Sequence, residues 1–290
     1  MRHLLLAFLL LLPQAARADT PVTVLASFSV IADIARQIGG PNVSVTSLVG
    51  PNQDLHAFEP RPSDARAIAG SDLVILNGLG IEGWIARMQG AAKPRRPPVI
   101  ATTGVKPRTM TEDGKTVTDP HAWQDVRNAA LYAANIRDAL VQADPAHAAA
   151  YQAATTAYIA RLVALDAETR TAFAAIPRDR RRVVTSHDAL GYFGAAYGID
   201  FRAPLGMSTE IEPSAKELAS LIRQIRRDNI RALFLENVGR DVLLEQVSRE
   251  TKVRIGGQLF SDALSPPDGP AGTYIDMIRH NTAALLAALR

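Results

Sequence analysis

The sequence predicts an α/β protein of two lobes, each with a mostly parallel sheet flanked by helices, joined by one long rigid helix. Two observations predict the lobes: strand-like apolar runs alternate with helix-like segments before residue 145, and the alternation resumes after residue 178. A third observation predicts the connection, because residues 146–176 lack glycine and proline and are rich in alanine and leucine. Such a helix would be about 45 Å long, which exceeds the width of a small lobe.

The chain begins with the features of a cleaved export signal. A short basic start precedes a leucine-rich apolar run over residues 4–12, and small residues at positions 16 and 18 form a cleavage site. The apolar run is about half as long as the roughly 20 residues that a membrane span requires. We therefore expect residues 1–18 to be a signal peptide and the mature protein, starting at Asp19, to act in the periplasm.

Composition is that of an ordinary globular protein and restricts its partners. Loss of Arg2 and Arg17 with the leader reduces 32 basic residues to 30, against 29 acidic residues. This near balance argues against nucleic-acid binding. Separately, we expect the protein to be a monomer. The chain has no cysteine, which excludes lipid attachment, disulfides and thiolate ligands. A bound metal would therefore be held by nitrogen and oxygen atoms.

Residues 19–145 form the first expected lobe. Runs of β-branched and aliphatic residues predict its strands, and apolar residues at helical spacing predict its helices. Paired glycines end the first helix, and Ser63 is expected to cap the second. The expected elements are strands at 22–28, 43–49, 73–76 and 99–101, helices at 31–38, 63–69 and 84–88, a polar loop over 106–118, and a helix from residue 126.

Residues 146–177 form the expected linking helix and residues 178–290 the second lobe. Asp144-Pro145 interrupts the helical pattern ahead of the linking helix. Repeated strand–helix units with short connections predict a parallel sheet covered by helices on both faces. The expected elements of this lobe are strands at 183–185, 199–202, 232–235 and 253–255, and helices at 189–197, 214–227, 242–251 and 274–289.

Three histidines and one aspartate each follow a strand-like run: His56, His121, His187 and Asp262. Ligands of open α/β sheets bind beyond the carboxyl ends of the strands, which is where these residues fall. Three neutral imidazoles and one carboxylate can close a tetrahedron around a divalent transition-metal ion. We therefore expect the four residues to be metal ligands that only tertiary structure can bring together.

Each candidate ligand has a structural alternative. Taken alone, His56 could be a surface-loop histidine, His187 could cap a buried strand, and Asp262 could cap a turn. The segments around His56 and His121 share an aspartate two residues before the histidine and an aromatic residue two residues after it. Such an aspartate could accept the second ring N–H of a ligating imidazole, which favours the metal site.

Several other polar residues have expected roles outside the ligand set. Glu236 ends a strand and is expected to support the ligands from outside. Glu212 and Ser214 are expected to organise the start of the helix that follows them. His147 and His280 lie in helical, polar settings and are expected to be solvated.

At these residues the chain resembles the periplasmic zinc- and manganese-binding proteins of ABC importers, also called cluster A-I or cluster 9 solute-binding proteins. The resemblance covers essentially the whole mature chain and is carried by five segments: HAFEPRPSD at 56–64, DPHAW at 119–123, TSHDALGYF at 185–193, EPS at 212–214 and SDAL at 261–264. It implies a metal clamped between two lobes, with two ligands from each lobe, and delivery of that metal to an ABC transporter membrane permease.

The nature of the ligands favours zinc. Three imidazoles and one carboxylate suit Zn²⁺, whereas Mn²⁺ prefers more oxygen ligands. Manganese-type relatives typically place a glutamate at the third position, where this chain has His187. We expect a high-affinity zinc-binding protein, with a manganese-binding importer component of the same family as the alternative. Many zinc relatives carry a histidine-rich loop between the first two ligands, but residues 106–118 contain no histidine, which argues against loop-assisted capture.

Two other classes of function use a similar site. A zinc hydrolase would keep three protein ligands and an open position for water. Here four ligands are available and no His-Glu-x-x-His motif occurs, so we expect no enzyme. An adhesion or metallochaperone role, suggested by relatives that have been called adhesins, would use the same four residues as transport.

Overall fold

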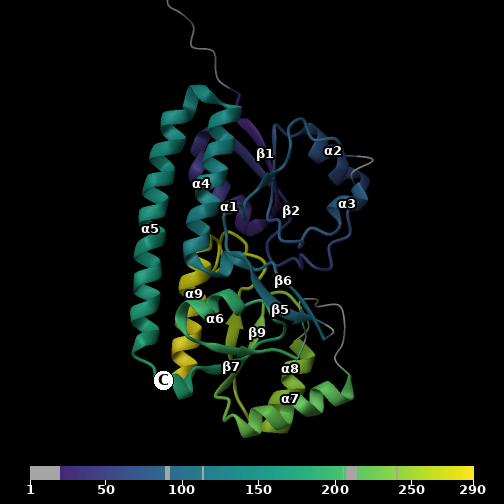
Figure 1. The fold of residues 1–290 in the computed structure, drawn as a ribbon, viewed down its shortest axis with the longest axis vertical. Helices are drawn as coiled ribbons and strands as arrows, with labels where there is room; N and C mark the ends of the chain where they lie inside the picture. The colour runs from purple at the N-terminus through teal and green to yellow at the C-terminus, as the bar shows by residue number, and fades with distance from the viewer. Residues whose placement is uncertain (1–19, 89–91, 113, 205, 207–213, 240) are drawn as a thin grey trace, which may run out of the picture.

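The computed structural model describes residues 20–290 except 89–91, 113, 205, 207–213 and 240 (Figure 1). The expected signal peptide, residues 1–18, and Glu212 lie outside the described residues. No helix within the described part of the chain is long and apolar enough to cross a membrane.

Two four-stranded parallel sheets form the centres of two lobes that are stacked along the long axis of the molecule (Figure 1). The first lobe has strand order β2-β1-β3-β4, and its strands are β1 Val22–Phe28, β2 Val43–Val49, β3 Leu73–Leu76 and β4 Val99–Ile100. The second lobe has strand order β10-β9-β7-β8, and its strands are β7 Arg182–Val184, β8 Asp200–Arg202, β9 Ala232–Glu236 and β10 Ile255–Leu259. The predicted two-lobe α/β class is confirmed.

Both faces of the first sheet are covered, which explains why its strands are apolar at consecutive positions. Successive side chains of β1 point to opposite faces, so Val24 and Ala26 contact one helical layer and Leu25 contacts the other. The first layer contains α1 Ser29–Gly39 and α4 Val126–Ala143. The second contains α2 Pro62–Gly70 and α3 Ile85–Met88.

Helix α2 begins one residue earlier than predicted, and Ser63 is not its cap. Pro62 occupies the first turn, where its fixed φ angle suits a helix and its missing N–H costs no hydrogen bond. The cap position is Arg61, whose backbone N–H donates to Asp64 Oδ2 at 2.7 Å. The prediction for Ser214 is confirmed, because its hydroxyl accepts from the Glu217 N–H at the start of α7 Ala215–Arg227.

The segment predicted as a polar loop is an antiparallel hairpin of β5 Arg108–Glu112 and β6 Lys115–Asp119. Its threonines alternate with Met110 and Val117, a period-two pattern of a half-buried ribbon, and Gly114 has the positive φ of 73° that its turn requires. The hairpin reaches the second lobe, where the Arg108 N–H donates to Tyr192 Oη at 2.9 Å.

The second sheet is also covered on both faces. One face packs against α7 and α8 Asp241–Thr251, and the other against α6 Gly191–Tyr197 and α9 Tyr274–Leu289. Strand β10 lies further along the chain than the predicted 253–255. The prediction missed its position because the strand contains two glycines, which weaken a strand pattern. Gly256 allows close packing against Phe234 and Ala288, and the pairing register shifts before Gln258.

The predicted linking helix is present as α5 Ala148–Ala174, which runs along one side of both lobes (Figure 1). Its buried hydrophobic residues belong to one core cluster that continues from the first lobe into the second. Helix α9 supplies a second connection that the sequence did not predict, because Tyr274 N–H donates to Asp33 Oδ2 of α1 at 2.8 Å. The lobes are therefore joined by packed helices as well as by the chain.

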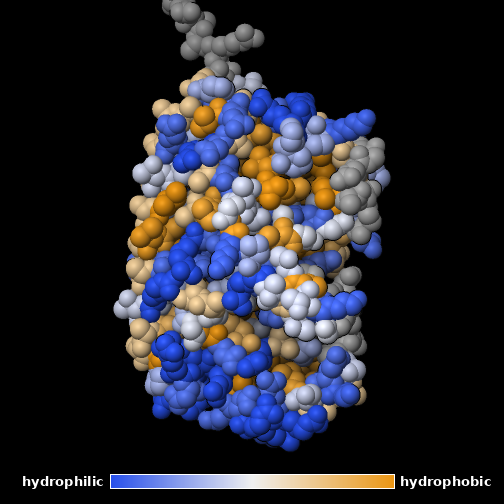
Figure 2. All heavy atoms as spheres, viewed as in Figure 1, coloured by the Kyte–Doolittle hydropathy of each residue, from blue (hydrophilic) through white to orange (hydrophobic). Residues whose placement is uncertain are grey.

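The surface of α5 away from the lobes is solvent-exposed and partly apolar. Val163 is 63% exposed, whereas the adjacent Leu162 is 1% exposed. Figure 2 shows apolar and hydrophilic residues mixed along the edge formed by α5. Helix α5 thus has no exclusively apolar face, and its packing depends on particular buried residues such as Leu162.

Leu162→Ala tests whether the α5 contacts stabilise the molecule. Loss of this buried side chain should lower the free energy of unfolding of the metal-free protein by about 2–5 kcal/mol, because a cavity remains in the shared core. Val163→Ala, the adjacent control, should change it by less than about 0.5 kcal/mol. Urea denaturation measures both, and equal effects would contradict the packing role.

Candidate metal centre

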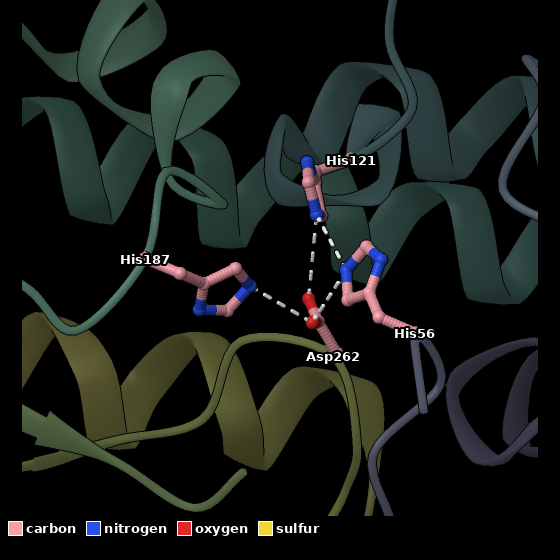
Figure 3. A group of neighbouring side chains, drawn as sticks. All are labelled: His56, His121, His187 and Asp262. Atoms are coloured by element: carbon pink, nitrogen blue, oxygen red, sulfur yellow. Dashed lines mark hydrogen bonds and ion pairs between the residues drawn. The ribbon is translucent and has the colours of Figure 1, made fainter. Parts of the chain in front are cut away.

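The four predicted ligand residues converge between the two lobes (Figure 3). One candidate ligand atom from each residue lies within 4.8 Å of the others. Two residues come from each lobe: His56 follows β2, His121 follows β6, His187 follows β7 and Asp262 follows β10. Three of them are completely buried, and the His56 side chain is 8% exposed. Folding therefore brings together the four residues; their role as ligands stays a prediction.

Asp262 contacts all three histidines of the cluster. Its Oδ2 is 3.0 Å from His187 Nε2 and 3.2 Å from His56 Nε2, and its Oδ1 is 3.7 Å from His121 Nε2. His121 Nε2 is also 3.3 Å from His56 Nε2. Four atoms placed tetrahedrally around a zinc ion at about 2.0–2.1 Å are about 3.3 Å apart. The contacts of 3.0, 3.2 and 3.3 Å are close to the length of such tetrahedron edges, and the remaining distances in the cluster are longer, up to 4.8 Å.

A carboxylate fixes the orientation of His121. Asp119 Oδ1 is 2.9 Å from His121 Nδ1 and also accepts from the His121 backbone N–H at 3.0 Å. The other ring nitrogen, Nε2, then points into the cluster, as an outer hydrogen bond to a ligating imidazole requires. Asp54, in the corresponding position before His56, instead accepts from the backbone N–H groups of His56 and Ala57 at 2.8 and 3.3 Å. It shapes the loop that carries His56.

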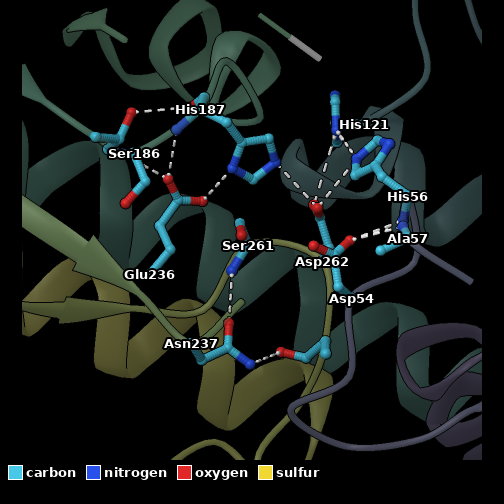
Figure 4. A network of polar contacts seen from close by, with 12 residues as sticks. Asp54, His56, Ala57, His121, Ser186, His187, Glu236, Asn237, Ser261 and Asp262 are labelled. Atoms are coloured by element: carbon cyan, nitrogen blue, oxygen red, sulfur yellow. Dashed lines mark hydrogen bonds and ion pairs between the residues drawn. The ribbon is translucent and has the colours of Figure 1, made fainter. Parts of the chain in front are cut away.

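Glu236 supports His187 in a similar way, as the sequence predicted. Its Oε1 accepts from the backbone N–H groups of Ser186 and His187 at 2.8 and 3.0 Å. Its Oε2 lies 2.9 Å from His187 Nδ1, an ion-pair contact whose geometry departs from a linear hydrogen bond. The Nε2 atom of His187 is thereby directed to Asp262 (Figure 4).

Electrostatic interactions within the cluster shift two pKa values in opposite directions. Burial raises the pKa of the Asp262 carboxyl, but the imidazoles of His187 and His56 outweigh burial and hold it well below its ordinary value. Burial lowers the pKa of His187, but the carboxylates of Glu236 and Asp262 outweigh burial and raise it well above its ordinary value. Without a metal, the pair is therefore most stable as imidazolium and carboxylate.

The cluster buries more negative than positive charge. The three carboxylates of Asp119, Glu236 and Asp262 are at most 2% exposed. Among the described residues, no lysine or arginine forms an ion pair with Glu236 or Asp262, and Arg108 approaches Asp119 only to 3.9 Å. Buried carboxylates need a compensating cation or proton, so the arrangement suits a divalent metal ion.

Trp123 and Gln124, which follow His121, connect its segment to the turn that carries Asp262, and the sequence did not predict this contact. Trp123 Nε1 and Gln124 Nε2 both donate to the Ser261 carbonyl oxygen, at 2.8 and 2.6 Å. Their buried polar atoms are separated from Ser261 by more than 130 residues of chain, so no local pattern indicates the contact.

The remaining two histidines of the described chain lie outside the cluster. Both are partly exposed to solvent, and each also has a polar partner within the protein. His147 Nδ1 is 2.7 Å from Asp144 Oδ2, next to the break between α4 and α5. His280 Nε2 is 3.0 Å from the Gln258 carbonyl oxygen, and its ring stacks edge-on against Phe260.

Comparison with known proteins identifies the family of this chain. The family model described as "Zinc-uptake complex component A periplasmic" matches residues 24–288. The iron-binding protein YfeA of Yersinia pestis is 34% identical over 256 residues, which cover 88% of this chain and 82% of that protein. The manganese-binding lipoprotein MntA of Halalkalibacterium halodurans is 32% identical over 267 residues, covering 92% and 88%.

Solved structures of similar proteins have the same fold. The periplasmic zinc-binding protein TroA from Treponema pallidum has a TM-score of 0.87 and 29% identity, covering 93% of this chain and 99% of that chain. The Mn-bound periplasmic metal-binding protein from Candidatus Liberibacter asiaticus has a TM-score of 0.83 and 32% identity, covering 93% and 100%. The chain therefore belongs to the zinc-uptake complex component A family, the metal-binding substrate-binding proteins of ABC transporters, which are carriers and not enzymes.

Proposed function

We propose that this protein captures Zn²⁺ with high affinity in the periplasm and delivers it to the membrane permease of an ABC transporter. His56, His121, His187 and Asp262 would hold the ion. The observation that carries the proposal is the convergence of three imidazole Nε2 atoms on one buried carboxylate, at 3.0, 3.2 and 3.7 Å from its oxygens. Asp262 would complete the four-ligand set, which distinguishes a carrier from a hydrolase with an open water position.

The choice of zinc rests on donor chemistry. Three nitrogen donors and one carboxylate suit a borderline ion such as Zn²⁺, whereas an oxygen-rich set would suit Mn²⁺. The names of the similar proteins refer to iron, manganese and zinc, so relatedness alone does not select the ion. Manganese import is the alternative, and His187 is the residue that argues against it.

The architecture supports a monomeric clamp. We assign residues 19–145 and 178–290 to the two lobes and residues 146–177 to the segment that links them, with residues 1–18 as the export signal. Helix α5 Ala148–Ala174 lies within the linking segment and packs against both lobes. Ligands from both lobes then meet at the interface, where a small separation of the lobes would release the ion.

Metal competition tests the choice of ion. Protein isolated from the periplasm of its own host should contain zinc, and excess Mn²⁺ should displace little of it, because nitrogen donors and the general stability order both favour Zn²⁺. Elemental analysis measures the bound metal, and competition titration measures the ratio of affinities. Since zinc outcompetes manganese in most sites in vitro, manganese in the host-derived protein would overturn the zinc assignment.

His187→Ala tests the ligand set. Zinc affinity should fall by more than the about 10–100-fold that loss of an outer partner costs, because a direct ligand is removed. His147→Ala, which removes a histidine outside the cluster, should bind zinc as the wild type does. Isothermal titration measures affinity and circular dichroism verifies folding. A folded His187→Ala protein with unchanged affinity would remove this residue from the site.

Zinc affinity should rise with pH. An imidazole must be neutral to bind metal. Because the pKa of His187 is raised above the ordinary imidazole value of about 6.5, the metal must displace a proton from His187 even at a pH above that value. Binding should therefore release protons at neutral pH. Titrations in buffers of different ionisation enthalpy measure that release. A zinc affinity that stays constant between about pH 5.5 and 8 would contradict histidine ligation.

A further inference from the structure

We propose that Glu236 and Asn237, at the carboxyl end of β9, form the positioning element of the metal centre. Neither would touch the ion, but together they contact three of the four ligand segments (Figure 4). The inference rests on the proposed function and identifies what sets the geometry of that site. It also identifies a hydrogen bond between ligand-bearing segments of different lobes.

Glu236 acts on the first of these segments. Its Oε1 accepts from two consecutive backbone N–H groups, those of Ser186 and His187, and its Oε2 is 2.9 Å from the His187 ring. One carboxylate thus fixes both the backbone and the ring of a ligand. His187 Nδ1 faces Glu236, which leaves Nε2 as the atom available to metal.

Asn237 acts on the segment that carries Asp262. Its Nδ2 donates to the Ala263 carbonyl oxygen at 3.0 Å, and its Oδ1 accepts from the Ser261 N–H at 3.3 Å. The side chain therefore bonds to the residue before Asp262 and to the residue after it. This holds the tight turn on which the aspartate is presented.

Asn237 also reaches across to the first lobe. Its Nδ2 donates to Asn52 Oδ1 at 3.1 Å, and the Asn52 N–H donates to the Leu264 carbonyl oxygen at 2.9 Å. Asn52 lies four residues before His56 and has a φ of 52°, a left-handed conformation that asparagine tolerates better than most residues. Asn237 thus connects the His56 loop to the Asp262 turn.

These contacts make one strand end a common reference for ligands that come from both lobes. Glu236 and Asn237 are adjacent, so the end of β9 fixes the positions of His187, Asp262 and the His56 loop relative to one another. A divalent ion is sensitive to such alignment, because outer partners orient the ligands. Loss of Glu236 should change coordination, and loss of the Asn52–Asn237 contact should speed metal release.

Glu236→Gln tests the effect on coordination, with Co²⁺ as the probe because its visible absorption reports ligand geometry. The amide oxygen can still accept from the backbone N–H groups, but the amide nitrogen cannot accept from the ring of His187. We expect about 10–100-fold weaker Co²⁺ and Zn²⁺ binding and an altered Co²⁺ spectrum.

Glu82→Gln is the matched control. Glu82 is a buried carboxylate that accepts from two consecutive N–H groups, those of Asn77 and Gly78, and within the described part of the chain it hydrogen-bonds to none of the four ligand residues. This variant should keep the wild-type affinity and spectrum even if it is less stable. A wild-type spectrum and affinity for Glu236→Gln, or equal changes in both variants, would overturn the role of Glu236.

A double-mutant cycle tests the contact between the lobes. Asn52→Gly removes the side chain, retains a residue suited to positive φ, and lies on an exposed loop, so the protein should fold. It should raise the rate of zinc release to a chelator by about 3- to 10-fold, the effect of one hydrogen bond. In an Asn237→Ala background it should have no further effect.

Asn281→Ala is the control for the cycle. Asn281 bonds to the N–H and carbonyl oxygen of Phe260 within the second lobe and is not part of the connection to Asn52. It should show no coupling to Asn52→Gly. Additive effects of Asn52→Gly and Asn237→Ala, or a wild-type release rate for Asn52→Gly, would overturn the connection. If wild-type protein binds neither Co²⁺ nor Zn²⁺, the proposed function itself fails instead.

Discussion

The structure depends on the burial of negative charge where its two lobes meet. Asp119, Glu236 and Asp262 are almost completely inaccessible to solvent, and the imidazoles of His121 and His187 are their main polar partners. Each buried charge costs several kcal/mol unless it is compensated. The raised pKa of His187 means that its proton supplies part of the compensation, and a divalent ion would supply it better. For the same electrostatic reason, we expect metal binding to stabilise the contact between the lobes.

The fold meets this requirement by packing the lobes together away from the ligands. Helix α5 spans both lobes, and α9 returns from the second lobe to α1, so one apolar core continues through the interface. Near the ligands the contacts are polar instead: Trp123 and Gln124 bond to Ser261, and Asn52 bonds to Asn237. Apolar packing at the helical side resists sliding of the lobes, whereas individual hydrogen bonds on the ligand side can break singly. The interface between the lobes is therefore apolar at the helices and polar at the ligands.

Much of this could be predicted from the sequence because its signals are local. Strand-like runs placed His56 and His187, a repeated arrangement of aspartate, histidine and aromatic residue indicated His121, and a glycine-free stretch indicated α5. The hairpin of β5 and β6 was missed because its threonines have the composition of a polar loop, and β10 was misplaced because Gly256 gains its packing from Phe234, far away in sequence. The contacts of Trp123 and Asn237 had no local signal at all. Such contacts depend on how the two lobes are placed, which no short window of sequence records.

The position of the carboxylates bears on the choice of ion. Asp262 is the only carboxylate among the four converging residues, while Asp119 and Glu236 lie behind His121 and His187. An ion at the centre would thus contact mainly nitrogen, yet three negative charges would surround its two positive ones, with Arg108 3.9 Å from Asp119 to offset the excess. A site that placed the same charges in direct contact would present more oxygen and suit Mn²⁺. Because Asp119 and Glu236 lie behind the histidines, their charge still attracts a divalent ion, while the atoms that face the ion are mainly the imidazole nitrogens that Zn²⁺ favours.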